Sequence, residues 1–241
     1  MPTPPTSNAK GVLYLDGTRL SRALRAGIAR VLNDADYLNK INVFPVPDGD
    51  TGTNLVLTMR SVLMALAGHK DRKLGPTIEL IADSALDGAR GNSGAIMAQF
   101  FHGLSDGASG VSRWCTDKFS KAVLRGAEYA REAMGEPREG TIISVIDEFS
   151  AEITRQVGEP GGRDFAQVLE RGLARARTAL ANTPNQLEVL RKAGVVDAGA
   201  KGFVDLLEGI TDFVLNGSPR DSLDQPLPQV PTEELEFAGM G

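Results

Sequence analysis

Apolar residues recur at intervals of three and four positions along most of the chain, which places them on one face of an α-helix. Eight long stretches of this kind follow one another, separated by segments rich in glycine or proline. Their first clear apolar positions are Leu20, Leu55, Ile78, Ile96, Phe119, Ile142, Phe165 and Phe203. No segment alternates apolar and polar residues over a sustained length, so the pattern predicts an all-α fold with about eight helices.

Residues suited to helix ends lie between these stretches. Asp16 is placed to cap the first helix, whose apolar stripe continues to Leu38. Thr141 is placed to begin the sixth helix. The tripeptide Thr183-Pro184-Asn185 is expected to interrupt the chain, and a short helix that ends near Gly194 is expected to follow it.

The two ends of the chain differ in composition from the helical part. Residues 1–11 begin with three prolines among the first five positions and are expected to form a flexible N-terminus. Residues 218–241 carry four prolines among Asp, Gln and Glu, which is typical of a linker. We therefore expect one domain over residues 12–217 and a tail that leads toward a further domain missing from this sequence.

Composition and charge exclude several classes of protein. The chain is 41% hydrophobic and 24% charged, as in ordinary globular proteins, and only 5% aromatic. A net charge of −5, without a dense basic run, argues against a nucleic-acid-binding protein. The single cysteine, Cys115, excludes an internal disulfide framework. No signal-peptide pattern and no apolar run of the roughly 18 residues that span a bilayer is present, so a cytoplasmic protein is expected.

The segment from Asn42 to Asn54, N-V-F-P-V-P-D-G-D-T-G-T-N, is the main candidate for chemistry. Its carboxylates Asp48 and Asp50, separated by Gly49, can chelate one hard metal ion or bridge two. The helix that follows offers free N–H groups to an anion. The alternative is an ordinary surface turn, because Asp-Gly is a common turn dipeptide. The flanking prolines and the T-G-T-N sequence favour a site for a metal and a phosphate.

Three further glycine-containing segments also precede predicted helices. They are G-A-R-G-N-S-G from Gly88, Gly140-Thr141, and G-V-V-D-A-G-A-K-G from Gly194. Ser93 and Thr141 are suited to cap a helix or to bind phosphate, and both interpretations remain open. The last segment is not a P-loop, because its residue spacing differs and no parallel sheet is predicted. Several helix N-termini that converge on one anionic ligand would explain the recurrence of these segments.

In this order, the four segments resemble those of the DhaL, or DAK2, family, the nucleotide-binding L domain of dihydroxyacetone kinases. They are most similar to the N-terminal domain of bacterial fatty acid kinase, which phosphorylates fatty acids held by a DegV-type carrier protein. The resemblance covers about residues 12–216. It implies an antiparallel barrel of eight helices, in agreement with the helix pattern, with ATP and Mg²⁺ bound at one end.

The resemblance also implies roles for individual residues. Asp48 and Asp50 are the expected catalytic residues and metal ligands. Asn42 is the expected further metal ligand, in the approximate place of an aspartate in dihydroxyacetone kinases, and its lack of charge weakens the case for two metal ions. The expected contacts to ATP or ADP are Thr51, Gly52, Thr53, Asn54, Gly91, Asn92, Ser93, Gly94, Thr141, Asp197 and Gly199.

The function implied is transfer of a phosphoryl group from ATP to a substrate held by a partner protein, with a fatty acid on a DegV-like carrier favoured. A carboxylate acceptor is already ionised at neutral pH, so this domain needs no general base. Two alternatives stay open: the L subunit of a dihydroxyacetone kinase, acting with a K-type subunit, and a non-catalytic ADP-binding regulatory module. The oligomeric state is also open, and a homodimer is one arrangement that the sequence permits.

Overall fold

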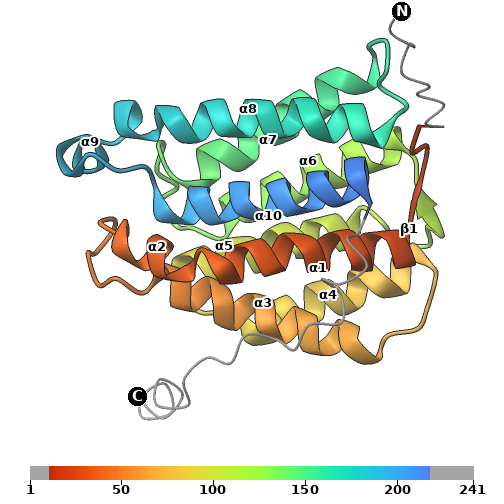
Figure 1. Cartoon of the computed structure of the whole chain (residues 1–241), viewed down its shortest axis with the longest axis horizontal. Coiled ribbons are helices and arrows are strands. Elements are labelled where there is room, and N and C mark those ends of the chain that lie inside the picture. The colour runs from red at the N-terminus through yellow and green to blue at the C-terminus, as the bar shows by residue number, and fades with distance from the viewer. Residues whose placement is uncertain (1–10, 218–241) are drawn as a thin grey trace, which may run out of the picture.

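The computed structural model of the protein describes residues 11–217, so the expected flexible N-terminus and linker-like tail lie almost entirely outside the described residues. The described part contains ten helices and two strands of two residues each (Figure 1). In chain order the elements are β1 (Leu15–Asp16), α1 (Gly17–Asn33), α2 (Ala35–Lys40), α3 (Thr51–Gly68), α4 (Leu74–Gly88), α5 (Gly91–Asp106), β2 (Arg113–Trp114), α6 (Thr116–Glu132), α7 (Ile142–Val157), α8 (Phe165–Gln186), α9 (Glu188–Ala193) and α10 (Ala198–Asn216).

Eight long helices form a closed antiparallel ring. Proceeding around the ring, α1 packs on α3, then α4, α5, α6, α7, α8 and α10 follow, and α10 packs on α1 again. The helices α2 and α9 are additions of six residues each at one end of the ring. The short antiparallel pair of β1 and β2 lies at the other end (Figure 1). The prediction of an all-α fold with about eight helices is therefore confirmed.

Side chains fill the interior of the ring. Phe203 of α10 makes edge-on contacts with Phe100 of α5, at 5.4 Å between ring centroids, and with Phe149 of α7, at 5.8 Å. This geometry is the one that aromatic pairs prefer, and it joins three helices through one residue. None of the helices within residues 11–217 is long and apolar enough to cross a lipid bilayer.

The helices α1 and α10 approach each other at two glycines. A Cβ atom added to Gly27 would lie 2.6 Å from the carbonyl oxygen of Leu206, and one added to Gly209 would lie 2.5 Å from the carbonyl oxygen of Ala26. Larger residues at either position would push the helices apart. This close approach lets the first and last helices of the ring close it.

Two predicted helix boundaries differ from the structure. The first predicted helix is divided at Asp34 into α1 and α2. The expected interruption at Thr183-Pro184-Asn185 is absent, because α8 continues to Gln186 with Pro184 inside it. Pro184 has no N–H to donate to the carbonyl of Leu180. The hydroxyl of Thr183 donates to that carbonyl instead, at 2.8 Å, so the last turn of the helix loses no hydrogen-bond partner there.

Three helices begin earlier in the chain than their first clear apolar positions, within the glycine-containing segments. Helix α3 begins at Thr51, α5 at Gly91 and α10 at Ala198, so the last residues of each segment form the first helical turn. The cap predicted at Asp16 is confirmed, since its carboxylate accepts the N–H of Arg19 at 2.9 Å. The apolar stripes located the buried faces but not the first turns, which are polar.

Candidate functional site

The N-termini of α3, α5, α7 and α10 lie at the same end of the ring, together with α2 and α9 (left in Figure 1). This follows from the antiparallel order, because every second helix of the ring points the same way. At the starts of α3, α5 and α7, the N-cap side chains of Asp50, Arg90 and Thr141 make no capping hydrogen bond. The N–H of Thr53 in α3 is bound by Asn39, and that of Ile142 in α7 by Asp197. The other first-turn N–H groups are left for another acceptor, and the helix dipole favours an anion there.

The loop before α3 presents two carboxylates at this end. Asp48 and Asp50 are both exposed, and Gly49 between them has φ +70°, which favours glycine. The amide nitrogen Nδ2 of buried Asn42 donates to Oδ1 of Asp48 at 2.7 Å. The other amide atom of Asn42, Oδ1, is buried and has no hydrogen-bond partner among the described residues. Asn42 therefore orients Asp48 and leaves one acceptor unsatisfied beside the two carboxylates.

The electrostatics of this loop favour a bound cation. Partial burial raises the pKa of Asp50, hydrogen bonding from Asn54 lowers it, and the adjacent charge of Asp48 raises it again. Neither carboxylate makes an ion pair with a described residue. Two carboxylates and a neutral amide oxygen suit Mg²⁺, which usually takes one or two protein carboxylates and completes its shell with water and substrate phosphate. Within residues 11–217 no cluster of three or more His, Cys, Asp or Glu side chains provides a metal cage.

Helix α2 holds the first turn of α3 in place. The side chain of Asn39 makes two hydrogen bonds to Thr53: its Nδ2 donates to the hydroxyl at 3.0 Å, and its Oδ1 accepts the backbone N–H at 3.0 Å. Gly52 packs so closely on α2 that an added Cβ would lie 2.1 Å from the carbonyl oxygen of Ala35. Gly52 was predicted as a nucleotide contact, and in this structure its lack of a side chain serves helix packing.

The first turn of α5 lies directly against α3. A Cβ added to Gly91 would lie 2.4 Å from Nδ2 of Asn54, and Gly91 has φ +58°. One turn further along α3, the hydroxyl of Thr58 accepts the backbone N–H of Arg90 at 3.2 Å, and a Cβ added to Gly94 would lie 2.5 Å from that hydroxyl. The structure thus brings the first two predicted segments into contact.

The starts of α5, α7 and α10 also meet. A Cβ added to Gly199 would lie 2.7 Å from the hydroxyl oxygen of Ser93 and 3.5 Å from Cβ of Ile142, the first residue of α7. Thr141, which precedes Ile142, is buried, and its hydroxyl donates to the carbonyl of Arg138 at 2.7 Å. Together with the contact between α3 and α5, this places all four predicted segments around one region.

Asp197 is buried and caps α10. Its carboxylate accepts the N–H of Ala200 at 2.8 Å, and its own N–H donates to the hydroxyl of Thr183 at 3.2 Å. Burial raises the pKa of Asp197 to about 6, and hydrogen bonds from the backbones of Ala200 and Ile142 oppose the shift. The contacts of Asp197 in this structure are therefore those of an N-cap residue, one of the two roles that an acid between helices can take.

The profile of the DAK2 domain family matches residues 45–212, which is most of the described chain and includes all four segments except Asn42 and its neighbours. The chain belongs to the DAK2 domain family. The predicted relation to DhaL-type domains is confirmed at this level.

Curated relatives of this DAK2 domain are longer proteins. An uncharacterized protein of Staphylococcus epidermidis is 32% identical over 221 residues, a match that covers 92% of this chain and 39% of that protein. An uncharacterized protein of Staphylococcus saprophyticus is 34% identical over 198 residues, or 82% of this chain and 36% of that protein. The chain thus spans less than two fifths of the length of these relatives.

Among solved structures, the fold is similar to that of the dihydroxyacetone kinase from C. freundii in complex with AMP-PNP and Mg²⁺. The TM-score is 0.61 at 15% sequence identity, over 88% of this chain and 36% of that chain. The native form of the same kinase gives a TM-score of 0.59 at 16% identity. At this identity the likeness shows the fold, and it agrees with the family assignment.

Two residues that position the site of this DAK2 domain were missed by the sequence analysis. Asn39 was placed within the region of the first helix, and nothing in its neighbourhood distinguishes an amide that binds the next helix from one that faces solvent. Thr58 is a polar position inside an apolar stripe, with relative exposure of 0%. A buried threonine in such a stripe is the one signal that pointed to an internal contact.

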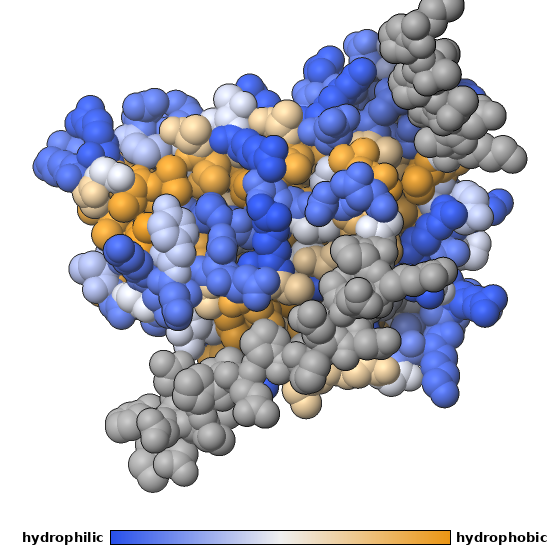
Figure 2. All heavy atoms as spheres, viewed as in Figure 1, coloured by the Kyte–Doolittle hydropathy of each residue, from blue (hydrophilic) through white to orange (hydrophobic). Residues whose placement is uncertain are grey.

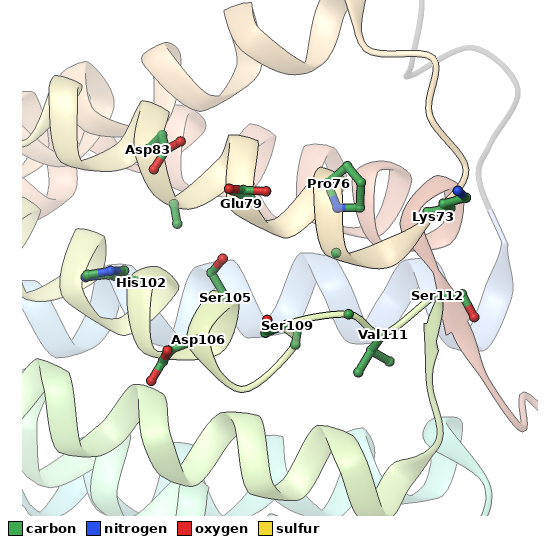
Figure 3. A pocket seen from close by; sticks show the side chains of 14 residues that line it. Lys73, Pro76, Glu79, Asp83, His102, Ser105, Asp106, Ser109, Val111 and Ser112 are labelled. Atoms are coloured by element: carbon green, nitrogen blue, oxygen red, sulfur yellow. The ribbon is translucent and has the colours of Figure 1, made fainter.

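A cavity of about 680 Å³ lies elsewhere, between α4, α5 and the segment that leads to β2 (Figure 3). Figure 3 shows Glu79 and Asp83 of α4 on one side of it and His102 and Asp106 of α5 on the other. None of the predicted site residues lines this cavity.

Proposed function

We propose that this domain binds ATP with Mg²⁺ at the end of the ring where α3, α5, α7 and α10 begin, and transfers the γ-phosphoryl group to a substrate held by a partner protein. Within the family, the proposal assigns it to the fatty acid kinase type, with a fatty acid on a DegV-like carrier as acceptor. The chain spans only part of its relatives, so a further domain contributes to turnover in this proposal.

The observation that carries the proposal is the meeting of the carboxylate loop with the starts of α3 and α5, whose N-cap side chains make no capping hydrogen bond. Asp48 and Asp50 repel one another in the absence of a cation, and the unpartnered oxygen of Asn42 lies beside them. Mg²⁺ bound to nucleotide phosphates would supply charge neutralisation for phosphoryl transfer. The adjacent N–H groups at the starts of α3 and α5 are placed to bind phosphate oxygens.

The chain's own residues divide into two groups in this mechanism. Asp48 and Asp50 would hold the Mg²⁺ ion, and Asn42 fixes the orientation of Asp48. The first turns of α3 and α5 bind the phosphate oxygens through backbone N–H groups, with Asn54 at their contact. Thr141, Asp197 and Gly199 form the far wall of the region and are proposed to contact the nucleotide. The rate enhancement comes from positioning and charge neutralisation.

Phosphoryl transfer to a fatty acid needs no proton removal at the acceptor. One carboxylate oxygen of the fatty acid bonds to the γ-phosphorus as the bond from that phosphorus to the β,γ-bridging oxygen breaks. The products are an acyl phosphate and ADP, and the leaving oxygen takes the electron pair of the broken bond as negative charge, which a bound Mg²⁺ would neutralise. A hydroxyl acceptor would require a base, and no His, Lys or third carboxylate lies in the described carboxylate loop from Asn42 to Asp50.

The first experiment is isothermal titration calorimetry of the wild type and of Asp48→Ala and Asp50→Ala with ADP and ATP, each with and without Mg²⁺. Each substitution is expected to weaken Mg²⁺-dependent affinity by more than about 100-fold, because even outer partners of metal ligands cost 10- to 100-fold. Asp83→Ala, which removes an exposed carboxylate from the cavity between α4 and α5, is the matched control. Wild-type affinity in both loop variants would refute the proposed site.

The second experiment separates the acceptors. The longest form of the protein is incubated with radiolabelled ATP and either a fatty acid on a DegV-type carrier or dihydroxyacetone with a K-type subunit. Acyl phosphate, trapped with hydroxylamine, is expected only in the first mixture. Product in the second mixture would assign an L subunit of a dihydroxyacetone kinase, the arrangement favoured by the similarity in fold. Tight nucleotide binding with no transfer in either mixture would indicate a regulatory ADP-binding module.

A further inference from the structure

Lys201 is a charged residue that the proposed chemistry does not use. It lies in the first turn of α10, and its side chain is largely buried, with 23% relative exposure. Its ammonium donates to Oδ2 of Asp34 at 2.8 Å and to Oδ1 of Asp205. The ammonium also lies 5.8 Å from the ring centroid of Tyr37 in α2, within the range of a cation–π contact. Two carboxylates and one ring therefore fix this charge.

Asp34 connects Lys201 to the carboxylate loop. It is the single residue between α1 and α2, in the N-cap position of α2, where an aspartate usually accepts a backbone N–H of its own helix. Its side chain makes no such bond here. The carboxylate is instead committed to Lys201, so the ion pair ties the start of α2 to the start of α10.

Helix α2 is the support of the first turn of α3. Asn39 in α2 holds both the N–H and the hydroxyl of Thr53, and Ala35 packs on Gly52. The segment that joins α2 to α3 carries both carboxylates, Asp48 and Asp50. A shift of α2 would therefore move Asp48 and Asp50 relative to the starts of α5 and α10.

The buried carboxylate of Asp205 requires the positive charge of Lys201. Asp205 has relative exposure of 0%, its Oδ2 has no hydrogen-bond partner among the described residues, and its Oδ1 is bound by Lys201. Removing one member of a buried ion pair leaves an uncompensated charge, which is strongly destabilising. The pair thus fixes the rotamer of Lys201 and directs its remaining hydrogen bonds to Asp34.

We propose that Lys201 is a positioning residue that sets the Asp48–Asp50 loop through its ion pair with Asp34 and through α2. The inference rests on the proposed function for its effect on Mg²⁺ binding, but the contact itself is independent of that function. In this arrangement the ammonium binds carboxylates of its own chain and does not bind phosphate.

A second ion pair between the same helices provides a matched control. Arg30 of α1, about one turn before Asp34, pairs with Glu208 of α10, which also pairs with Arg177 of α8. Hydrophilic side chains cover α1 and α10 in the middle of the face shown in Figure 2. Loss of the Arg30 pair therefore removes one contact between α1 and α10 and leaves the ion pair between Lys201 and Asp34 in place.

The test uses Asp34→Ser, because serine is a favourable N-cap residue but is too short to reach Lys201. In the nucleotide-free protein, amide hydrogen exchange over residues 35–54 is expected to accelerate by about tenfold, a change of the size seen for residues that couple distant sites. Mg²⁺-dependent nucleotide affinity is expected to fall by about the same factor, with little change in affinity without Mg²⁺. Arg30→Gln is expected to leave both quantities within about twofold of wild type.

The double variant Lys201→Met with Asp205→Asn is expected to match Asp34→Ser, because it breaks the same tie and also removes the buried charge. The inference is overturned if exchange over residues 35–54 is unchanged in Asp34→Ser, or if Arg30→Gln accelerates it equally. It is also overturned if Asp34→Ser and the double variant lose Mg²⁺-dependent nucleotide affinity only in proportion to their loss of unfolding free energy in urea. Absence of Mg²⁺-dependent nucleotide binding in the wild type would refute the proposed function, while the exchange result would still decide whether Lys201 positions the loop.

Discussion

Replacing Asp197 by asparagine is expected to remove a pH-dependent loss of stability from the folded protein. Asp197 is buried at the start of α10, where its carboxylate accepts the N–H of Ala200. Burial disfavours the charged form, which raises the pKa of this carboxyl from 3.8 to about 6. An asparagine keeps one acceptor oxygen for Ala200 and carries no charge at any pH.

The direction of the effect follows from proton binding. Between pH 3.8 and about 6 the folded protein holds a proton on Asp197 that the unfolded chain has lost, so stability falls as the pH rises through this window. A shift of about two units corresponds to a loss of about 3 kcal/mol that is complete above pH 7, at about 1.36 kcal/mol per unit. The asparagine variant lacks this loss, although its single acceptor oxygen adds a cost that does not depend on pH.

The assay is urea unfolding of the wild type and Asp197→Asn at several pH values from about 4 to 7.5. The measured quantity is the difference in unfolding free energy between the two proteins, in which contributions from all other titrating groups cancel. This difference is expected to move by about 3 kcal/mol in favour of the variant as the pH rises. A difference that stays constant across this range would refute the assignment of a raised pKa to Asp197.

Two further substitutions test the packing around the site. Gly52→Ala places a Cβ 2.1 Å from the carbonyl oxygen of Ala35 and is expected to cost about 1–3 kcal/mol in urea unfolding, whereas Gly68→Ala in the same helix meets nothing within 4 Å and is expected to cost nothing. Thr183→Val removes a fully buried hydroxyl that serves two backbone groups and is expected to cost about 1–3 kcal/mol, whereas the exposed Thr178→Val is expected to change the melting temperature little. Equal effects within either pair would contradict the corresponding packing argument.

The long helices could be predicted from the sequence because their signal is local. A buried face repeats every three to four residues, and each of the eight long helices contains enough repeats to reveal it. The two failures have non-local causes. Helix α1 ends at Asn33, and the next residue, Asp34, is bound by a lysine 167 residues further along the chain. Helix α8 continues through Pro184 because the preceding threonine side chain replaces the missing donor.

The segments of the candidate site could be located in the sequence, but the contacts between them could not. The order of the four segments indicated the family, and the family profile confirms it. Which glycine approaches which neighbour depends on packing between helices that are distant in the sequence. Gly52 lies against α2, and Gly199 lies against Ser93 of α5. The glycines of these segments, which suggested a site for an anion, are thus also needed for the helices to pack closely.

The charged residues of this region form two groups: those whose functional groups are bound by other residues of the chain, and those whose functional groups are not. Asp197 caps a helix, and Lys201 binds two carboxylates, so their functional groups are occupied within the chain. Asp48 and Asp50 are exposed, adjacent and without an ion pair to a described residue. An arrangement that leaves two neighbouring carboxylates unpaired costs stability unless a cation binds there. These contacts support the proposals that the loop before α3 holds the metal and that the start of α10 positions this loop.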